Sequence, residues 1–521
     1  MGFSDPGCYG GEIHTPNLDR LAAGGLRFTQ FYNTSRCWSS RASVLTGYYA
    51  QQVRRDALAP SDDPSKHSAA GGGVNGTRPA WARLLPELLH SLGYCSYHSG
   101  KWHLDGLPTQ NGFDRSFSYS DSDHHFLPGG VQAEIDPPLE PLSPGEGYYA
   151  ATAVADQAIR QLREHGRRHG DRPFFEYLAF TEPHFPVQAP QADIDCYRGR
   201  YREGWDVLRQ QRWQRMTSLG IVNCALSKLD PDIIPSWNLP EKTLYAEIGP
   251  GEECRAVDWD SLNAGQKNFQ PIKMAIHAAM IQRMDREIGR VLDQVKAMGA
   301  WDDTLIFFLS DNGASAEQMI RGDRHDPAAA PGSAKSFLCI GPAWSSAANT
   351  PFRLHKSWVH EGGITTPLIA HWPQGIAARG ELRHDPGHLI DIAPTILELA
   401  GGKWPKEFAG KPVPTPPGTS LLPALAKDGS VKHDYLWWYH IGNRALRVGN
   451  WKLVAASKSP WELYDLATDR CESKNLAAIH PEKVKELEQI WTRHMEEFRA
   501  LAMQDYVPEK APKKDPSKQK Q

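Results

Sequence analysis

The sequence has little net charge, no long apolar run and no closely spaced cysteines. Its 58 basic and 61 acidic residues leave a formal charge of −3, which gives no reason to expect nucleic acid as a partner. It contains no run of about 18 apolar residues, so no segment is expected to span a membrane. The eight cysteines form no Cys-x-x-Cys pair, and their spacing predicts neither a zinc site nor a compact disulfide framework.

The chain is longer than one typical domain, so a large domain and a smaller one are expected. It has 521 residues, which exceeds the usual size of a single hydrophobic core. Five prolines within residues 403–419 predict a linker. This divides the chain into a first domain over 1–402 and a second over 420–505. Residues 506–521 are rich in lysine, proline and glutamine and are predicted to form a disordered basic tail.

Short apolar runs alternate with amphipathic segments in the first domain. The predicted strands lie at 26–32, 94–98, 174–180, 304–309 and 367–371, with predicted helices at 80–92, 149–165 and 273–298. Strands that alternate with helices favour an α/β fold with a doubly wound, mostly parallel sheet.

The second domain shows a different pattern. Four short strands are predicted at 435–440, 445–448, 452–455 and 462–464, followed by a helix at 481–503 with one apolar face. Because short connections join these strands, we expect a small α+β subdomain made of an antiparallel sheet and a helix.

Polar residues suited to chemistry lie in the loops next to the predicted strands of the first domain; most follow a strand, and Lys356 precedes the strand at 367–371. They are Cys37, Arg41, Lys101, His103, His184, Asp311, Asn312 and Lys356. In a doubly wound sheet, ligands bind beyond the carboxyl ends of the strands. The sequence therefore predicts that these residues meet in one site.

Cys37 and Arg41 lie in the loop and helix start expected after the first strand. The amino end of a helix offers free backbone N–H groups and the positive end of its dipole. Such surroundings suit a nucleophile that acts on an anionic ester. The simpler interpretation is a buried cysteine beside a helix arginine, with no chemistry.

The segment from Cys37 to Gly47 reads Cys-Trp-Ser-Ser-Arg-Ala-Ser-Val-Leu-Thr-Gly. It resembles the sulfatase signature, in which Cys or Ser-x-Pro-Ser-Arg is followed by x-x-x-Leu-Thr-Gly. Ser39 stands where that family usually has proline. The resemblance implies that a maturation enzyme oxidises Cys37 to formylglycine, whose hydrate attacks the sulfur of a sulfate ester.

Three further motifs resemble segments of the same family in the same order. They are Gly-Lys-Trp-His at 100–103, Pro-His-Phe-Pro at 183–186, and Lys356 ahead of Glu-Gly-Gly at 361–363. By this resemblance, Lys101 contacts the sulfate oxygens and stabilises the aldehyde hydrate, and His103 is the base that releases sulfate. His184 and Lys356 are expected to bind sulfate and to protonate the leaving oxygen.

Asp311 and Asn312 supply oxygen atoms of the kind that Ca²⁺ or Mg²⁺ prefers. Taken alone, Asp-Asn-Gly predicts a turn. Its resemblance to the family's second metal-binding motif implies instead that Asp311, Asn312 and the residue derived from Cys37 contact a Ca²⁺ ion.

Family members usually begin with an apolar strand that ends in Asp-Asp, the first half of the metal site. The present sequence starts just after that position, and neither the strand nor the aspartates are found. We expect Met1 to be an internal methionine of a longer chain. We also expect the chain as written to bind Ca²⁺ weakly, to be poorly active, and to lack a strand near the centre of its sheet.

The sequence therefore resembles a bacterial arylsulfatase-type member of the alkaline phosphatase superfamily. The expected reaction is hydrolysis of an aryl or carbohydrate sulfate, and the expected partners are that ester and the maturation enzyme. One alternative is a phosphoryl-transfer enzyme of the same superfamily, although such relatives usually carry Ser or Thr as nucleophile. Another is an inactive relative that binds a sulfated ligand. Members of this family usually act in the periplasm or outside the cell. We expect the same location for this protein if a signal peptide upstream of Met1 directs its export.

Overall fold

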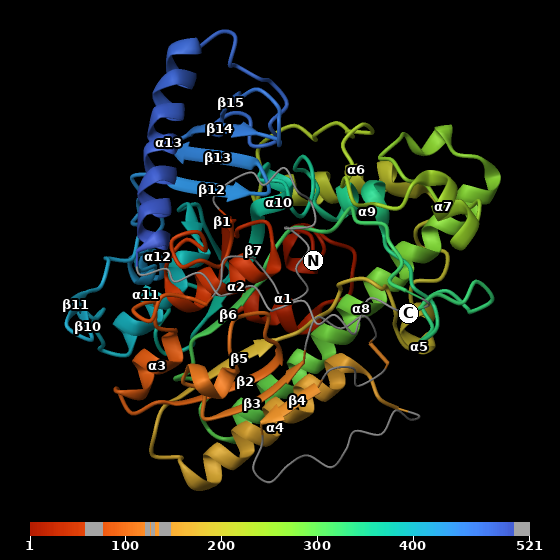
Figure 1. The fold of residues 1–521 in the computed structure, drawn as a ribbon. Coiled ribbons are helices and arrows are strands. Elements are labelled where there is room, and N and C mark those ends of the chain that lie inside the picture. The colour runs from red at the N-terminus through yellow and green to blue at the C-terminus, as the bar shows by residue number, and fades with distance from the viewer. Residues whose placement is uncertain (58–76, 120–124, 127–130, 135–146, 323, 505–521) are drawn as a thin grey trace, which may run out of the picture.

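The computed structural model describes residues 1–57, 77–119, 125–126, 131–134, 147–322 and 324–504. It has a large α/β part and a small C-terminal part, which lies at the top of Figure 1. Within the described residues, no helix combines the length and the apolar character needed to cross a membrane.

The strands of the large part form two separate sheets. The first contains β6 (Ile306–Leu309), β7 (Thr365–His371), β1 (Leu26–Tyr32) and β8 (Glu381–Arg383) in that order, with β9 (Gly387–His388) beside β1. The second contains β4 (Val131–Glu134), β3 (Arg115–Tyr119), β2 (Cys95–Lys101) and β5 (Phe174–Ala179). The pairings of β1 with β8 and β9, and of β2 with β3 and β5, are parallel. Strand β7 runs antiparallel to both β1 and β6, and β4 runs antiparallel to β3. The fold is thus α/β with mostly parallel strands, as the sequence predicts.

Helices cover both faces of the strands. The α-helices of the large part are α1 (Pro16–Ala23), α2 (Cys37–Thr46), α3 (Leu85–His90), α4 (Ala150–Arg168), α5 (Gln191–Asp195), α6 (Gly204–Ser218), α7 (Glu241–Glu247), α8 (Ala264–Ala297), α9 (Gly341–Ala348), α10 (Glu361–Ile364) and α11 (Ile392–Leu399). Short 3₁₀ helices occur at Gly7–Tyr9, Pro108–Asn111, Trp259–Ser261 and Leu389–Asp391. Strand β5 shows the two layers, because Phe174 and Leu178 pack with α4 and α8, whereas Phe175 packs with α2 and α3.

The two sheets leave a cleft between β5 and β6. Among the strands of the described residues, none pairs with β5 or β6 on the side that faces this cleft, and every residue of β6 is only half-buried. A cavity of about 990 Å³ lies there and is lined by residues of both strands, of α8 and of α2. Strands inside a parallel sheet are normally covered on both faces and paired on both edges. The cleft thus has the position and the unpaired edges that a further strand would require.

The C-terminal part is an antiparallel sheet backed by one long helix. Its strands are β12 (Leu436–His440), β13 (Asn443–Val448), β14 (Trp451–Ala455) and β15 (Glu462–Asp465), paired in sequence order. Helix α13 (Pro481–Met503) packs on them through Leu487, Trp491 and Phe498. The proline-rich stretch predicted as a linker carries β10 (Glu407–Phe408) and β11 (Lys411–Pro412), and α12 (Leu422–Ala426) follows it. The predicted tail at 506–521 lies outside the described residues.

The two parts are joined by buried contacts and by one disulfide. Cys224, after α6, is bonded to Cys471, after β15, across 247 residues of sequence. Lys452 on β14 forms ion pairs with Glu361 on α10 at 2.8 Å and with Glu472 at 2.7 Å, and all three side chains are inaccessible to solvent. The spacing of the cysteines did not predict this disulfide, because Cys224 and Cys471 are close to each other only in the folded chain.

Candidate active site

Cys37 is the first residue of α2, directly after the loop that leaves β1. Its side chain is 4% exposed, and its Sγ donates a hydrogen bond to Asn312 Oδ1 at 3.2 Å. Ser40, one turn into the helix, donates to the carbonyl oxygen of Asp311 at 2.5 Å. These bonds join the amino end of α2 to the loop after β6. Cys37 therefore lies where the helix dipole favours negative charge.

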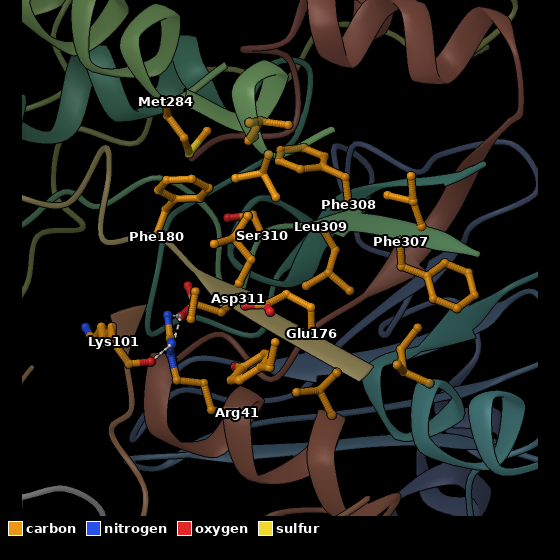
Figure 2. A pocket seen from close by; sticks show the side chains of 18 of the residues that line it. Arg41, Lys101, Glu176, Phe180, Met284, Phe307, Phe308, Leu309, Ser310 and Asp311 are labelled. Atoms are coloured by element: carbon orange, nitrogen blue, oxygen red, sulfur yellow. Dashed lines mark hydrogen bonds and ion pairs between the residues drawn. The ribbon is translucent and has the colours of Figure 1, made fainter. Parts of the chain in front are cut away.

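Arg41, Asp311 and Lys101 form a charged group in the cavity that Cys37 also lines, and Figure 2 shows these three side chains together. Arg41 donates to Asp311 Oδ2 through Nε at 3.1 Å and through Nη2 at 2.9 Å, and it donates to the carbonyl oxygen of Lys101 through Nη1 at 2.5 Å. Burial raises the pKa of the Asp311 carboxyl, but the charges of Arg41 and Lys101 outweigh it and lower that pKa to about 2. Asp311 is thus ionised at neutral pH, and Arg41 holds its carboxylate in place.

Lys356 and His184 form a second group in the same cavity. Lys356 Nζ lies 3.2 Å from His184 Nε2 and 2.9 Å from Glu317 Oε2. His184 Nδ1 lies 2.6 Å from the carbonyl oxygen of Phe185. This contact fixes the proton of a neutral His184 on Nδ1, so that Nε2 accepts a hydrogen bond from Lys356. The pair can therefore donate a proton toward the cavity.

Seven of the predicted site residues line one cavity, and the eighth lies next to it. The lining residues include Cys37, Arg41, Lys101, His184, Asp311, Asn312 and Lys356. His103 follows β2 in a left-handed backbone conformation with a φ of 59°, and its ring contacts that of Trp38 with 5.6 Å between centroids. The structure therefore places seven of the predicted residues around one cavity. His103 does not line this cavity but contacts Trp38, the residue after Cys37. The catalytic roles assigned to these residues remain predictions.

Sequence reasoning missed Glu317, which contacts several members of the site. Its carboxylate is buried and pairs with Lys356 and, at 3.2 Å, with Arg36 Nη1. Burial raises the pKa of Glu317, but Arg36, Lys356 and His184 together hold it well below its usual range. No motif marks this glutamate, because its partners come from segments far from it in sequence. The only sequence signal for Arg36 as a site residue is its position directly before Cys37.

The residues present do not form a calcium site by themselves. Ca²⁺ takes six to eight oxygen ligands and favours several carboxylates. Asp311 offers one carboxylate, which Arg41 already neutralises, and Asn312 Oδ1 accepts a hydrogen bond from Cys37. Among the residues that the structure describes, no three His, Cys, Asp or Glu side chains are placed to hold a metal ion together. No catalytic step is therefore derived through a metal.

Glu176 on β5 places a carboxyl group in the cleft, and Figure 2 shows it beside Leu309. Both of its oxygens are buried and have no hydrogen-bond partner within the described part of the chain. Burial raises the pKa of Glu176 to about 8. The ionised carboxylate is therefore penalised in the folded protein, and folding favours its protonated form.

Glu176→Gln is expected to flatten the pH dependence of stability. Because the folded-state pKa lies above the ordinary value of 4.5, the penalty is absent at low pH and grows as the pH rises toward 8. At about pH 9 the variant should be more stable than the parent by on the order of 5 kcal/mol. At about pH 5 the two should differ by less than about 1 kcal/mol.

Denaturant unfolding at both pH values tests this expectation. Glu398→Gln, an exposed position on α11, is the matched control and should change stability little at either pH. A Glu176→Gln effect of equal size at both pH values would mean that ionisation of this carboxyl is not involved.

These features place three basic side chains and an imidazole in one cavity with a cysteine at a helix amino terminus. Arg41, Lys101 and Lys356 bring positive charge from three separate segments, and His184 accepts a hydrogen bond from Lys356, which is the proton donor of the pair. Such an arrangement stabilises negative charge on a bound ester and on its leaving group.

A sulfatase family model matches residues 1–402, and the chain belongs to the sulfatase family. A second model, described as N-sulphoglucosamine sulphohydrolase, C-terminal, matches residues 352–500. The chain is 34% identical to an uncharacterized sulfatase of Schizosaccharomyces pombe, over 98% of the chain and 94% of that relative. It is 29% identical to an arylsulfatase of Klebsiella aerogenes, over 81% of the chain and 89% of that enzyme.

The fold is also similar to that of solved sulfatase-like structures. One of them is BT4656 in complex with its substrate D-glucosamine-2-N,6-O-disulfate. The two folds superpose with a TM-score of 0.59 at 20% identity, over 95% of the chain and 96% of that structure. At this level of identity the likeness concerns the fold.

Proposed function

We propose that this protein hydrolyses a sulfuric ester of an aryl or carbohydrate alcohol in the cavity beside Cys37. The observation that carries the proposal is the meeting of Cys37, Arg41, Lys101, His184 and Lys356 around one cavity of a sulfatase-family fold. Lys101 suits a non-bridging oxygen of a sulfate group, and the Lys356–His184 pair suits the oxygen that leaves.

Each residue has a distinct part in the proposed reaction. Lys101, at the end of β2, binds a sulfate oxygen, and Arg41 fixes Asp311 and the end of β2 in relation to α2. His184 and Lys356 share a hydrogen bond at 3.2 Å and protonate the leaving oxygen. His103 is assigned as the base of the second half-reaction. Its contact with Trp38 supports a position near Cys37.

The proposed nucleophile derives from Cys37 by a two-electron oxidation. The maturation enzyme converts the thiol-bearing carbon to an aldehyde and releases the sulfur as hydrogen sulfide. Molecular oxygen is the oxidant: it takes two electrons from Cys37 and two from an added thiol reductant, which becomes a disulfide, and its two oxygen atoms end in the aldehyde and in water. The resulting formylglycine supplies, as its hydrate, the oxygen that attacks sulfur. Burial of Cys37 in the folded chain supports modification before folding is complete. Ca²⁺ or Mg²⁺ near Asp311 and Asn312 is part of this proposal only together with further carboxylates.

The identity of the ester is proposed at the level of its class. An arylsulfatase name among the relatives and a sulfated glucosamine substrate in a solved neighbour support an aryl or sugar sulfate. The poor donor set for a metal favours a second candidate, a protein that binds a sulfated ligand without turnover. Cys37, in place of Ser or Thr, speaks against phosphoryl transfer.

Peptide mass spectrometry across Cys37 tests the proposal on protein coproduced with a formylglycine-generating enzyme. We expect the mass of an aldehyde at position 37. Cys37→Ala should lower the hydrolysis of 4-nitrophenyl sulfate by on the order of a thousandfold or more. Cys196→Ala, at an exposed free cysteine, is the control and should keep the parent rate.

Other results would change the assignment. An unmodified thiol together with sulfate-ester binding and no turnover would identify a binding protein. Faster hydrolysis of phosphate esters than of sulfate esters would identify a phosphoryl-transfer enzyme. Equal rates in Cys37→Ala and the parent would show that Cys37 is not the nucleophile.

A further inference from the structure

Trp237 is a large apolar side chain that the fold leaves 39% exposed. It lies in the segment between α6 and α7, and its indole Nε1 donates a hydrogen bond to Glu317 Oε1 at 2.9 Å. An exposed tryptophan whose polar atom is anchored presents a fixed apolar face to solvent. A surface of this kind commonly binds the flat part of a ligand.

The anchor of Trp237 is also the anchor of Lys356. Glu317 Oε2 pairs with Lys356 Nζ at 2.9 Å, and Lys356 in turn contacts His184. Ser315 Oγ donates to the same oxygen at 2.8 Å. One buried carboxylate therefore fixes the indole in relation to the pair that is proposed to protonate the leaving oxygen. The indole is thus linked through Glu317 to Lys356, the proposed proton donor.

Arg36 connects the same indole to the nucleophile. Its guanidinium carbon lies 4.8 Å from the ring centroid of Trp38 and 5.7 Å from that of Trp237. Arg36 is the residue before Cys37, and it pairs with Glu317 at 3.2 Å. Trp237 is therefore linked to both sides of the reaction: to Cys37 through Arg36, and to Lys356 through Glu317.

We propose that Trp237 is a specificity residue whose exposed face stacks on the ring of the alcohol that carries the sulfate ester. This inference rests on the proposed hydrolysis. The ring would be an aryl or pyranose ring, because each offers a flat face to an indole. Glu317 is then a positioning residue that sets the distance between this ring and the Lys356–His184 pair. A different account, in which Trp237 only shields the Arg36–Glu317 pair from water, predicts no dependence on the ring of the ligand.

The test compares esters with and without a ring in the mature, full-length protein. Trp237→Ala should raise KM for 4-nitrophenyl sulfate about tenfold with little change in kcat, and it should leave kcat/KM for methyl sulfate unchanged. Trp237→Phe should restore most of the loss. Ile479→Ala, at a side chain 63% exposed in the C-terminal part, is the control. Calorimetric competition against inorganic sulfate gives the same comparison without turnover.

Two results would overturn the inference. One is an equal loss for both esters and for inorganic sulfate, which would show that the indole only supports Glu317. The other is an unchanged KM for 4-nitrophenyl sulfate in Trp237→Ala. Failure of the proposed function looks different, because the parent protein would then hydrolyse neither ester, whether or not it binds inorganic sulfate.

Discussion

An apolar segment of about six residues that ends in two aspartates, fused ahead of Met1, is expected to raise Ca²⁺ affinity by on the order of a thousandfold. Sulfatase activity should rise with it. The chain as written offers Asp311 and Asn312, with one carboxylate that Arg41 already pairs. Two further carboxylates would turn this pair of oxygen donors into a charged site of the kind that holds Ca²⁺.

The geometry of the cleft supports this expectation. Met1 lines the cavity, and its carbonyl oxygen accepts a hydrogen bond from Ser310 Oγ at 3.1 Å, next to Asp311. A segment that runs toward Met1 between β5 and β6 would therefore end beside the proposed metal ligands. Strand β5 has six residues, so a segment of similar length can pair along it.

The matched control is the same segment ending in two asparagines. Both fusions should raise the midpoint of thermal unfolding, because both fill the cleft and pair the free strand edges. Only the aspartate version should gain Ca²⁺ affinity by calorimetry and turnover of 4-nitrophenyl sulfate. Submicromolar Ca²⁺ binding by the unfused chain would contradict the argument, as would equal affinity of the two fusions.

Local sequence patterns identified the elements whose signals are themselves local. Strand β1 has its predicted bounds, and helix α13 agrees with the predicted 481–503. Cys37 was expected at a helix start and is the first residue of α2. Each of these depends on a hydrophobic period or on a short motif, and both are carried by neighbouring residues.

Predictions failed where distant residues decide the structure. The helix expected at 80–92 is shortened to α3. One miss had a local cause: helix α8 begins nine residues before the expected 273, because Asn263 and Gln266 form a capping box ahead of Pro271. Lys101 ends a strand that was expected to stop at 98, since pairing with β3 and β5 extends it.

The residues that hold the candidate site in place could not be predicted from the sequence either, because they come from segments that are far apart in the chain. Glu317 was missed because its partners, Arg36, Lys356 and Trp237, come from three separate segments. The apolar run at 367–371 predicts a strand but not its direction, so the antiparallel pairing of β7 could not be predicted. This pairing explains why Lys356 precedes its strand, whereas Cys37 and Lys101 lie at or after the carboxyl ends of theirs.

Lys452→Met is expected to destabilise the folded protein by about 3–5 kcal/mol. Lys452 is completely buried on β14 between Glu361 at 2.8 Å and Glu472 at 2.7 Å. Removing its charge leaves two buried carboxylates without the cation that lies closest to both of them. Arg470, 3.7 Å from Glu361, is farther away. Denaturant unfolding at neutral pH measures the loss. Lys474→Met, at an exposed lysine, is the control and should change stability little.

The cause of this loss can be separated from a simple packing defect. Burial raises the pKa of Glu361, but Lys452 and Arg470 outweigh it and lower that pKa. The stability that depends on the ionised carboxylate is therefore present above the ordinary pKa of 4.5 and is lost as the pH falls below it. The cost of Lys452→Met should shrink as the pH falls, because protonation removes the unpaired charges.

A triple variant, Lys452→Met with Glu361→Gln and Glu472→Gln, should recover much of the stability at neutral pH for the same reason. Glu361 begins the short helix α10, five residues after Lys356. Lys452→Met should therefore also lower sulfatase activity, and the triple variant should restore part of it. If the triple variant is as unstable as Lys452→Met, the loss comes from packing around the lysine stem. The ion pairs of Lys452 would then contribute little to holding the C-terminal sheet against the segment that carries Lys356.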